Sequence, residues 1–253
     1  ITLGNREFQS GILALVEKDG TFSQHSMNYH RMLLHLALVY QRVTTQAGIT
    51  VSELIKERLA AATGWLAGHM DHSSGHAVNL GHNDGTNLLP IGSVDYADYR
   101  PTLQAASFAF LGSRCLPLRQ WDDLAACLQL SDTSANIPQL SALSTPTVQR
   151  VGNEKTWASL RICSFKSRPA HADLLHVEIW NDGVNLASDA GTYAYNLPRP
   201  WDNALSRTLV HNTVTVAGQD QMFRASKFLW LKRVNAQLLS CSRSEERRCR
   251  ERV

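Results

Sequence analysis

The sequence lacks the patterns that mark several common classes of protein. Its 253 residues include five cysteines, and none of them forms a CxxC pair, so we do not expect a cysteine-based zinc site. The odd number of cysteines also argues against a complete disulfide framework. No apolar run approaches the roughly 20 residues that cross a membrane, and the run MLLHLALVY is short and contains His35. We therefore expect no transmembrane segment.

Charge of one sign is also scarce. The net charge is only +3, and a composition of 43% hydrophobic and 19% charged residues is typical of a soluble globular protein. The basic tail SRSEERRCRERV has no interleaved aromatic residues and contains glutamates, so we expect no nucleic-acid partner. The chain begins at Ile1 without a methionine and ends in this tail, which leads us to expect a fragment whose signal peptide is not visible here.

The chain divides into two parts with different hydrophobic periods. Residues 1–135 show helical spacing in NYHRMLLHLALVYQRV, TVSELIKERLAAATGWLAGH, RPTLQAASFAFLG and LRQWDDLAACLQL. Thr50 and Glu53 have the spacing of a capping box. Residues 136–150 lie in a stretch rich in Ser, Thr and Pro that is typical of a linker. Residues 151–253 contain the strand-like runs KTWASLRICSF, LLHVEIW, HNTVTVAG and KFLWLKRVNAQLL, with a DG hairpin signal after VEIWN. Helices first and strands later indicate an α+β fold or two domains, and we expect the α+β class.

Histidines and carboxylates gather at the ends of the predicted strands. His171 and Asp173 are two residues apart, so an extended chain would point them to the same face. Asp189 and His211 follow in the next segments. Two imidazoles with one or two carboxylates suit a zinc-like ion, but the same residues could instead satisfy buried loops through hydrogen bonds.

Three further segments carry polar or aromatic side chains. Tyr29 and His30 lie where a loop rich in Gly, Ser and His enters a helix; cations there could lower the pKa of Tyr29, or Tyr29 could be an ordinary amphipathic residue. The tract GHMDHSSGHAVNLGHNDG could bind a metal, but we favour a polar loop that lines a cleft for an anionic ligand such as a sugar acid. In YNLPRPWDNALSRTLVHN, Trp201 and Tyr195 could stack on sugar faces, or Trp201 could fill a core. Arg199 or Arg207 could pair with a carboxylate.

Four segments together resemble the heparinase II/III-like polysaccharide lyase family. They are DGTFSQHSMNYHRM, NDGTNLLP, PAHADLLHVEIWNDGVNLASDAGTYAYN, and VHNTVTVAGQDQM followed by KFLW, in the order found in the family. The resemblance implies part of an α/α toroid followed by part of an antiparallel β-sandwich, with the active cleft between them. It also implies a periplasmic or secreted parent protein.

The resemblance implies β-elimination on anionic glycans that contain uronate. A base removes the proton beside the carboxyl group, an acid protonates the leaving oxygen, and a further group offsets the carboxylate charge. Tyr29 would be the acid and base, with His30 assisting. A divalent metal, with zinc the expected ion, would be held by His171, Asp189 and His211 and would brace the cleft wall. The expected substrate-binding residues are His82, Asn83, Arg207 and Trp201.

Two departures from the family pattern limit what the resemblance implies. Some members have a catalytic histidine at the position of Pro169, and the asparagine that neutralises the carboxylate lies upstream of this chain. We therefore expect little or no turnover from the fragment alone. A non-catalytic carbohydrate-binding protein with the same cleft is the main alternative. A hydrolase that uses Asp173 and Asp189 as paired carboxylates is a weaker one.

Overall fold

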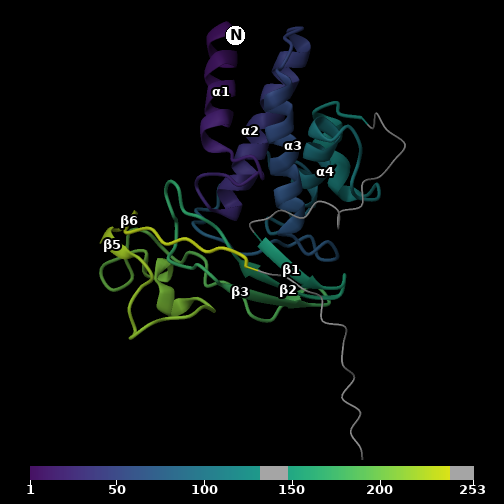
Figure 1. The fold of residues 1–253 in the computed structure, drawn as a ribbon. Helices are drawn as coiled ribbons and strands as arrows, with labels where there is room; N and C mark the ends of the chain where they lie inside the picture. The colour runs from purple at the N-terminus through teal and green to yellow at the C-terminus, as the bar shows by residue number, and fades with distance from the viewer. Residues whose placement is uncertain (132–147, 240–253) are drawn as a thin grey trace, which may run out of the picture.

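The computed structural model describes residues 1–131 and 148–239, with helices in the first range and antiparallel sheets in the second (Figure 1). The predicted α+β order is confirmed. Residues 136–147 of the predicted linker and the basic tail from residue 240 onward lie outside the described residues. The first strand begins at Val148, inside the range predicted as linker.

The helical part contains four longer helices and one short one. They are α1 (Thr2–Leu15), α2 (Met27–Gln46), α3 (Glu53–Gly68), α4 (Arg100–Phe110) and, after the 3-10 turn η1 (Gln120–Asp122), α5 (Asp123–Cys127). Ser26 caps α2 because its hydroxyl accepts a hydrogen bond from the backbone N–H of Tyr29 at 3.1 Å. The predicted capping box at Thr50 and Glu53 is wrong: α3 begins at Glu53 after Ser52, and the side chain of Ser52 makes no capping hydrogen bond.

The larger sheet is antiparallel, with its strands in chain order. It contains β1 (Val148–Gly152), β2 (Thr156–Arg161), β3 (Val177–Asn181) and β4 (Val184–Asn185). The predicted DG hairpin is confirmed, because Asp182 and Gly183 connect β3 to β4 with φ values of 46° and 80°. Two successive positive φ values match the right-handed twist of paired strands.

The remaining residues form short elements. They are the 3-10 turns η3 (Ala204–Ser206) and η4 (Thr208–Val210) and a two-stranded sheet of β5 (Phe223–Ser226) and β6 (Leu229–Leu231). The strand predicted over HNTVTVAG is wrong, because that segment contributes only an isolated bridge between Val216 and Gln219. Its side chains Val214 and Val216 are exposed, so no neighbouring strand covers their alternating pattern.

The larger sheet buries its polar face against the helices. Trp157 and Trp180 stack with ring centroids 5.2 Å apart, and both belong to the hydrophobic core that α2, α3 and α4 share. Glu178 and Ser159 are paired across β2 and β3 on this same face and are also buried. The alternation of LLHVEIW is therefore real, but its polar set points inward.

The opposite face of the sheet is apolar and exposed. Its members are Val151, Ile179 and Val184, joined by Leu175 and Leu186 from the flanking loops. A contiguous exposed apolar surface of this kind is uncommon on a monomeric soluble domain, and another layer of structure can pack there. In the ranges the structure describes, no helix is long and apolar enough to cross a membrane.

We predict that the two faces of β3 differ sharply in their contribution to stability. Trp180→Ala removes a side chain that is 2% exposed, whereas Ile179→Ala, its neighbour, removes one that is 40% exposed. The free energy of unfolding should fall by about 3–5 kcal/mol for the first change and by about 1 kcal/mol or less for the second. Urea denaturation of the two variants checks this, and equal losses would contradict the assignment of the buried face.

Candidate functional site

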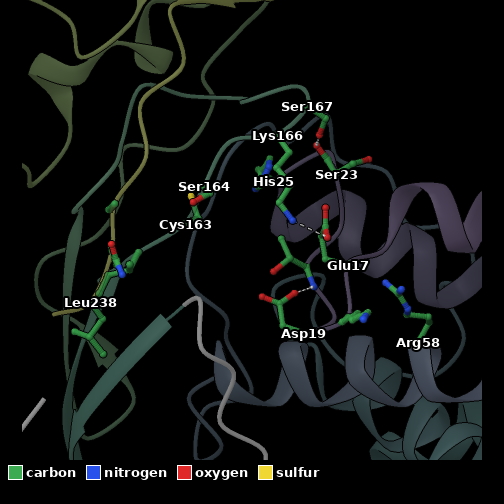
Figure 2. Close-up of a pocket in the computed structure, with 15 residues that line it drawn as sticks. Glu17, Asp19, Ser23, His25, Arg58, Cys163, Ser164, Lys166, Ser167 and Leu238 are labelled. Carbon is green, nitrogen blue, oxygen red and sulfur yellow. Dashed lines mark hydrogen bonds and ion pairs between the residues drawn. The ribbon is translucent and has the colours of Figure 1, made fainter. Parts of the chain in front are cut away.

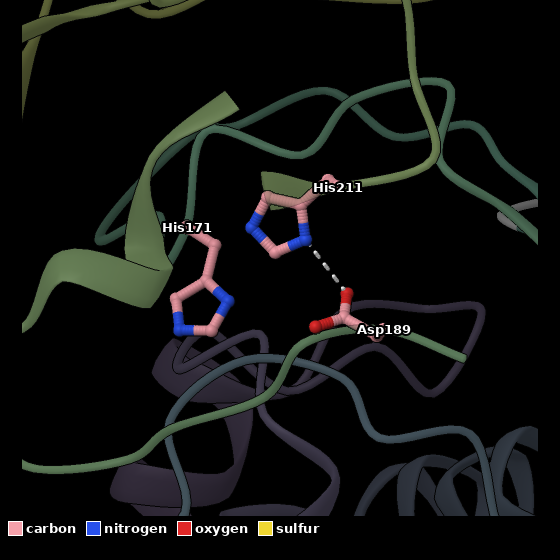
Figure 3. Close-up of side chains that lie close together, drawn as sticks. All are labelled: His171, Asp189 and His211. Atoms are coloured by element: carbon pink, nitrogen blue, oxygen red, sulfur yellow. Dashed lines mark ion pairs between the residues drawn. The ribbon is translucent and has the colours of Figure 1, made fainter. Parts of the chain in front are cut away.

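His171, Asp189 and His211 come together from three separate loops (Figure 3). His171 lies in the loop after β2, Asp189 follows β4, and His211 follows η4. One ligand atom from each side chain lies within 4.8 Å of the others, and all three residues are buried. Nδ1 of His211 is 3.2 Å from Oδ2 of Asp189. The structure thus gathers the three residues proposed as metal ligands.

Burial and charge act against each other in this cluster. Burial opposes ionisation of Asp189, but His211, His171 and nearby His176 outweigh it and hold the pKa of the carboxyl below its usual range. Burial lowers the pKa of His171 well below its ordinary value. Asp189 overcomes the same effect at His211 and raises its pKa. The cluster therefore combines one carboxylate with at least one neutral imidazole.

The hydrogen bonding of the cluster is incomplete. Both ring nitrogens of His171 and Nε2 of His211 are buried and have no hydrogen-bond partner among the described residues. Buried polar atoms are nearly always satisfied, so each such nitrogen calls for a partner. Two imidazoles and one carboxylate are also a donor set that zinc accepts, with a fourth position left for another ligand. The residues present fit a bound divalent ion.

A fourth histidine, His176, borders this group and was not identified from the sequence. Its Nε2 is 3.8 Å from Oδ2 of Asp189 and 3.9 Å from Oε1 of Glu178, while its Nδ1 accepts the backbone N–H of Asn212 at 3.1 Å. The signal was its position on the polar face of LLHVEIW, but alternation alone does not say which face of a strand is buried.

Asp173 does not join the set of three residues that could hold a metal, although its charge acts on His211 and His176. Residues 171–173 form a bend and not an extended strand, so the expectation that His171 and Asp173 share a face is wrong. The carboxylate of Asp173 lies 3.2 Å from the guanidinium of Arg161, and both side chains are buried. This buried ion pair gives Asp173 a structural partner, which makes the paired-carboxylate hydrolase the less favoured alternative.

Tyr29 lies in the first turn of α2 and reaches the loop after α3. Its hydroxyl donates a hydrogen bond to Oδ2 of Asp84 at 3.1 Å. Of the two alternatives, a pKa lowered by cations is not found: burial raises the pKa of Tyr29, and neighbouring Tyr195 and Asp84 raise it further. The groups close to the phenol are a second phenol and a carboxylate, not cations. Asp84 was not singled out from the sequence, although its NDG turn was noticed.

His82 lies between the tyrosines and the histidine cluster. Its ring centroid is 5.3 Å from that of His171 and 5.4 Å from that of Tyr195. Burial and the nearby charge of Arg168 lower the pKa of His82 to about 4, so the imidazole is neutral at pH 7. Asn83 follows and accepts a hydrogen bond from the hydroxyl of Tyr96 at 2.9 Å. Predicted site residues from both halves of the chain therefore adjoin one another.

Three other predicted site residues make no side-chain contact with the His171 cluster, His82 or Tyr29 among the interactions of the described residues. His30 is fully buried, stacks on Trp65 at 4.3 Å, and places Nε2 2.8 Å from the carbonyl of Ala62. Arg207 donates to Asp220 at 3.0 Å. Trp201 is 56% exposed. In this conformation His30 cannot touch a substrate, and Arg207 already has a carboxylate partner.

The histidine tract is dispersed in the same way. His69 is buried and places Nδ1 2.7 Å from the carbonyl of Trp65, and His76 is exposed. Within the described ranges, these residues do not join a group that could hold a metal. The position of His82 agrees with the favoured interpretation as a polar loop.

A cavity of about 720 Å³ lies elsewhere on the junction between the two halves (Figure 2). The connector around Glu17 and His25 and the loop around Lys166 line it, and Lys166 forms an ion pair with Glu17 at 3.0 Å. None of the predicted catalytic, substrate-binding or metal-binding residues lines this cavity. Its acidic and basic groups largely balance, so it does not select a ligand by charge.

The fold and the gathered side chains define an α+β protein whose candidate site draws on both the helical and the sheet part. Residues 148–250 match the family model described as "Heparinase II/III-like, C-terminal". This match confirms the resemblance to the heparinase II/III-like family over these residues. No curated protein sequence matches the chain.

Solved structures share the fold at low sequence identity. A heparinase III gene product is 15% identical with a TM-score of 0.60, and the match covers 86% of this chain and 32% of that one. The heparan sulfate lyase HepC from Pedobacter heparinus is 18% identical with a TM-score of 0.55, over 87% of this chain and 33% of that one. Another heparinase III is 14% identical with a TM-score of 0.55, over 86% and 35%. The chain thus spans about a third of the length of these structures.

We predict that Glu178, which lies beside the cluster, makes the stability of the fold depend on pH. Burial and the charge of Asp189 raise its pKa from 4.5 to about 7. Between these pH values the folded chain keeps a proton that the unfolded chain has released, so this residue makes the fold less stable as pH rises through the window. Glu178→Gln should remove that contribution and weaken the decline in the free energy of unfolding between pH 5 and pH 8.

Urea denaturation at both pH values measures the difference. Glu154→Gln, which changes an exposed glutamate, is the control and should keep the pH dependence of the unchanged chain. A parallel decline in the Glu178→Gln variant and the unchanged chain would contradict the raised pKa.

Proposed function

We propose that the chain is part of a polysaccharide lyase that cleaves anionic, uronate-containing glycans by β-elimination. The observation that carries the proposal is the continuous run of side chains from Asp84 and Tyr29 through Tyr195 and His82 to the His171 cluster. A site for elimination needs a proton donor and a neutral base on one substrate-facing surface. The run offers a phenol and a neutral imidazole. The match to the heparinase II/III-like family supports the same chemistry.

The finer architecture is part of this proposal. Residues 1–135 would be the C-terminal part of an α/α toroid, residues 136–150 a linker, and residues 151–253 the N-terminal part of a β-sandwich. Support for the sandwich comes from the exposed apolar face of the sheet around Ile179 and Val184, which is where a second sheet would pack. The parent protein would act on a glycan in the periplasm or outside the cell.

The proposed reaction places Tyr29 as the proton donor. A base takes the proton from the carbon next to the uronate carboxyl group, and its electron pair forms a carbon–carbon double bond. The bond to the glycosidic oxygen breaks, and the hydroxyl of Tyr29 gives its proton to that oxygen. Burial and the nearby Tyr195 and Asp84 keep Tyr29 protonated, as a donor must be. His30 is not included, because its buried ring cannot reach a substrate.

His82, Asn83, Arg207 and Trp201 remain the proposed substrate-binding residues. His82 adjoins both Tyr195 and the metal cluster, which places it best of the four. Arg207 would have to exchange its bond to Asp220 for one to a uronate carboxylate. Trp201 has more than half of its surface free for stacking on a sugar ring.

His171, Asp189 and His211 would hold a divalent ion, with zinc the expected one. A bound cation would supply positive charge beside the cleft and would fix the loops that carry its ligands. The rings of His82 and His171 pack in a T-shaped arrangement, so an ordered cluster would orient His82 toward the substrate.

A metal titration tests this part of the proposal. Replacing a ligand should weaken zinc binding at least about 100-fold, since loss of an outer-shell partner alone costs about 10–100-fold. His211→Ala and Asp189→Asn are the test variants, and His76→Ala, which removes an exposed histidine, is the control. Competition with a chromophoric chelator gives the affinities. Unchanged zinc binding in both test variants would refute the ligand set.

Elimination itself can be followed by ultraviolet absorbance, because its product carries a conjugated double bond. The chain and a form extended upstream would be incubated with a panel of uronate polysaccharides. Tyr29→Phe should lower the rate by about 100-fold or more, as expected for loss of a general acid. Tyr40→Phe is the control, because Tyr40 lies on the same helix and bonds to Asn5. Equal rates in the two variants would remove Tyr29 from the mechanism.

A non-catalytic carbohydrate-binding protein is the alternative function. Pro169 favours it, since this buried residue occupies a position where some members of the family carry a catalytic histidine. Glycan binding by both forms of the protein, with a flat absorbance trace, would support this alternative.

A further inference from the structure

The carboxylate of Asp84 is held in a fixed orientation. Its Oδ2 accepts the hydroxyl of Tyr29 at 3.1 Å. Its Oδ1 accepts the side-chain amide of Asn28 at 3.0 Å and the backbone N–H of Thr86 at 3.0 Å. Both oxygens are therefore engaged, and the two bonds to Oδ1 fix the rotation of the carboxylate so that Oδ2 faces the phenol of Tyr29. Asp84 is exposed, and these hydrogen bonds together outweigh the effect of burial and hold its pKa below the usual range, so it is ionised at neutral pH.

A buried network supports this carboxylate from behind. Oδ1 of Asn28 accepts a hydrogen bond from Arg31 at 2.9 Å and lies 2.8 Å from the hydroxyl oxygen of Tyr96, whose one hydrogen it shares with Oδ1 of Asn83. The guanidinium of Arg31 lies 4.1 Å from the ring centre of Tyr96 and 4.5 Å from that of Tyr99. Asn28 and Arg31 are almost fully buried. The network therefore ties the NDG turn rigidly to the first turn of α2, where Tyr29 lies.

We propose that Asp84 is a positioning residue that aims the hydroxyl of Tyr29 and keeps it protonated, so that Tyr29 serves as the general acid and another group serves as the base. This inference rests on the proposed elimination reaction. The ionised carboxylate accepts the phenolic hydrogen and, as a negative charge, opposes formation of a phenolate at the same place. The charged or titratable groups that face the phenol are Asp84 from the loop after α3 and Tyr195 from the loop after β4. Neither stabilises a phenolate, so a base role for Tyr29 is disfavoured.

The first test measures the phenol directly and needs no turnover. The chain is prepared with 3-fluorotyrosine, which is more acidic than tyrosine, and its titration is followed by fluorine NMR. Loss of one resonance in Tyr29→Phe identifies the signal of Tyr29. In Asp84→Asn the titration midpoint of Tyr29 should fall by about one to three pH units, the range expected for removing a nearby like charge.

Two further variants keep this test decisive. Asp84→Glu retains the charge and should hold the midpoint above that of Asp84→Asn. Asp95→Asn removes an exposed turn carboxylate that bonds only to the N–H of Ala97 among the described residues, and should leave the midpoint unchanged. An unaltered midpoint in Asp84→Asn, or equal midpoints in Asp84→Asn and Asp84→Glu, would overturn the proposal.

The second test separates a donor from a base by the leaving group. The upstream-extended protein would be given a natural glycan and a uronide with an aryl leaving group, which departs with little need of a proton. Asp84→Asn should lose at least about tenfold more rate on the natural glycan than on the aryl uronide, within the range of general acid effects. Equal losses on both would overturn the acid assignment. Absence of elimination in every variant, together with a shifted phenol titration, would refute the lyase function while the link between Asp84 and Tyr29 stands.

Discussion

One face of the larger sheet, which carries Trp157, Trp180 and Glu178, is buried against the helices, and the geometry of the candidate site depends on this packing. The stacked pair of Trp157 and Trp180 joins the helical core, and the indole N–H of Trp157 donates to Asp71 at 3.0 Å. Next to this pair, Asn79 donates its backbone N–H to Glu178 and its side-chain amide to the carbonyl of Asp189, each at 3.3 Å. The segment after α3 is therefore fixed to the sheet. Because that segment continues to His82 and Asp84, one docking surface sets the geometry of the whole candidate site.

The sequence predicted those parts of the fold that depend on local preferences. Helical spacing located α2, α3 and α4, and the Asp182–Gly183 dipeptide located the hairpin. It could not predict which face of β3 is buried, because Trp180 and Glu178 alternate with Ile179 and both faces suit a strand. The false strand at HNTVTVAG has the same origin, since alternation is necessary for a strand but pairing partners decide whether one forms.

The candidate site was predictable where a family pattern linked distant residues, and less so elsewhere. The resemblance grouped His171, Asp189 and His211, which the structure brings together, although spacing alone left them among several polar residues. Asp84 and His176 were missed because each is placed beside the candidate site by a contact with a residue in another segment of the chain. The sequence left the direction of the Tyr29 pKa shift open for the same reason: the neighbours that set it, Asp84 and Tyr195, come from other segments of the chain.

The spacing of the His171 cluster along the chain has a consequence for the stability of the strand-containing half. Two chain segments separate its three members, the first containing the β3–β4 hairpin and the second containing η3 and η4, and the members meet only when both segments have folded back. Any ion or shared proton that joins them therefore works as a reversible cross-link, and its stabilisation comes partly from the loop-closure entropy removed from the unfolded chain. This cross-link would lie entirely within the strand-containing half. The two halves would then respond differently to a chelator, although they share one core.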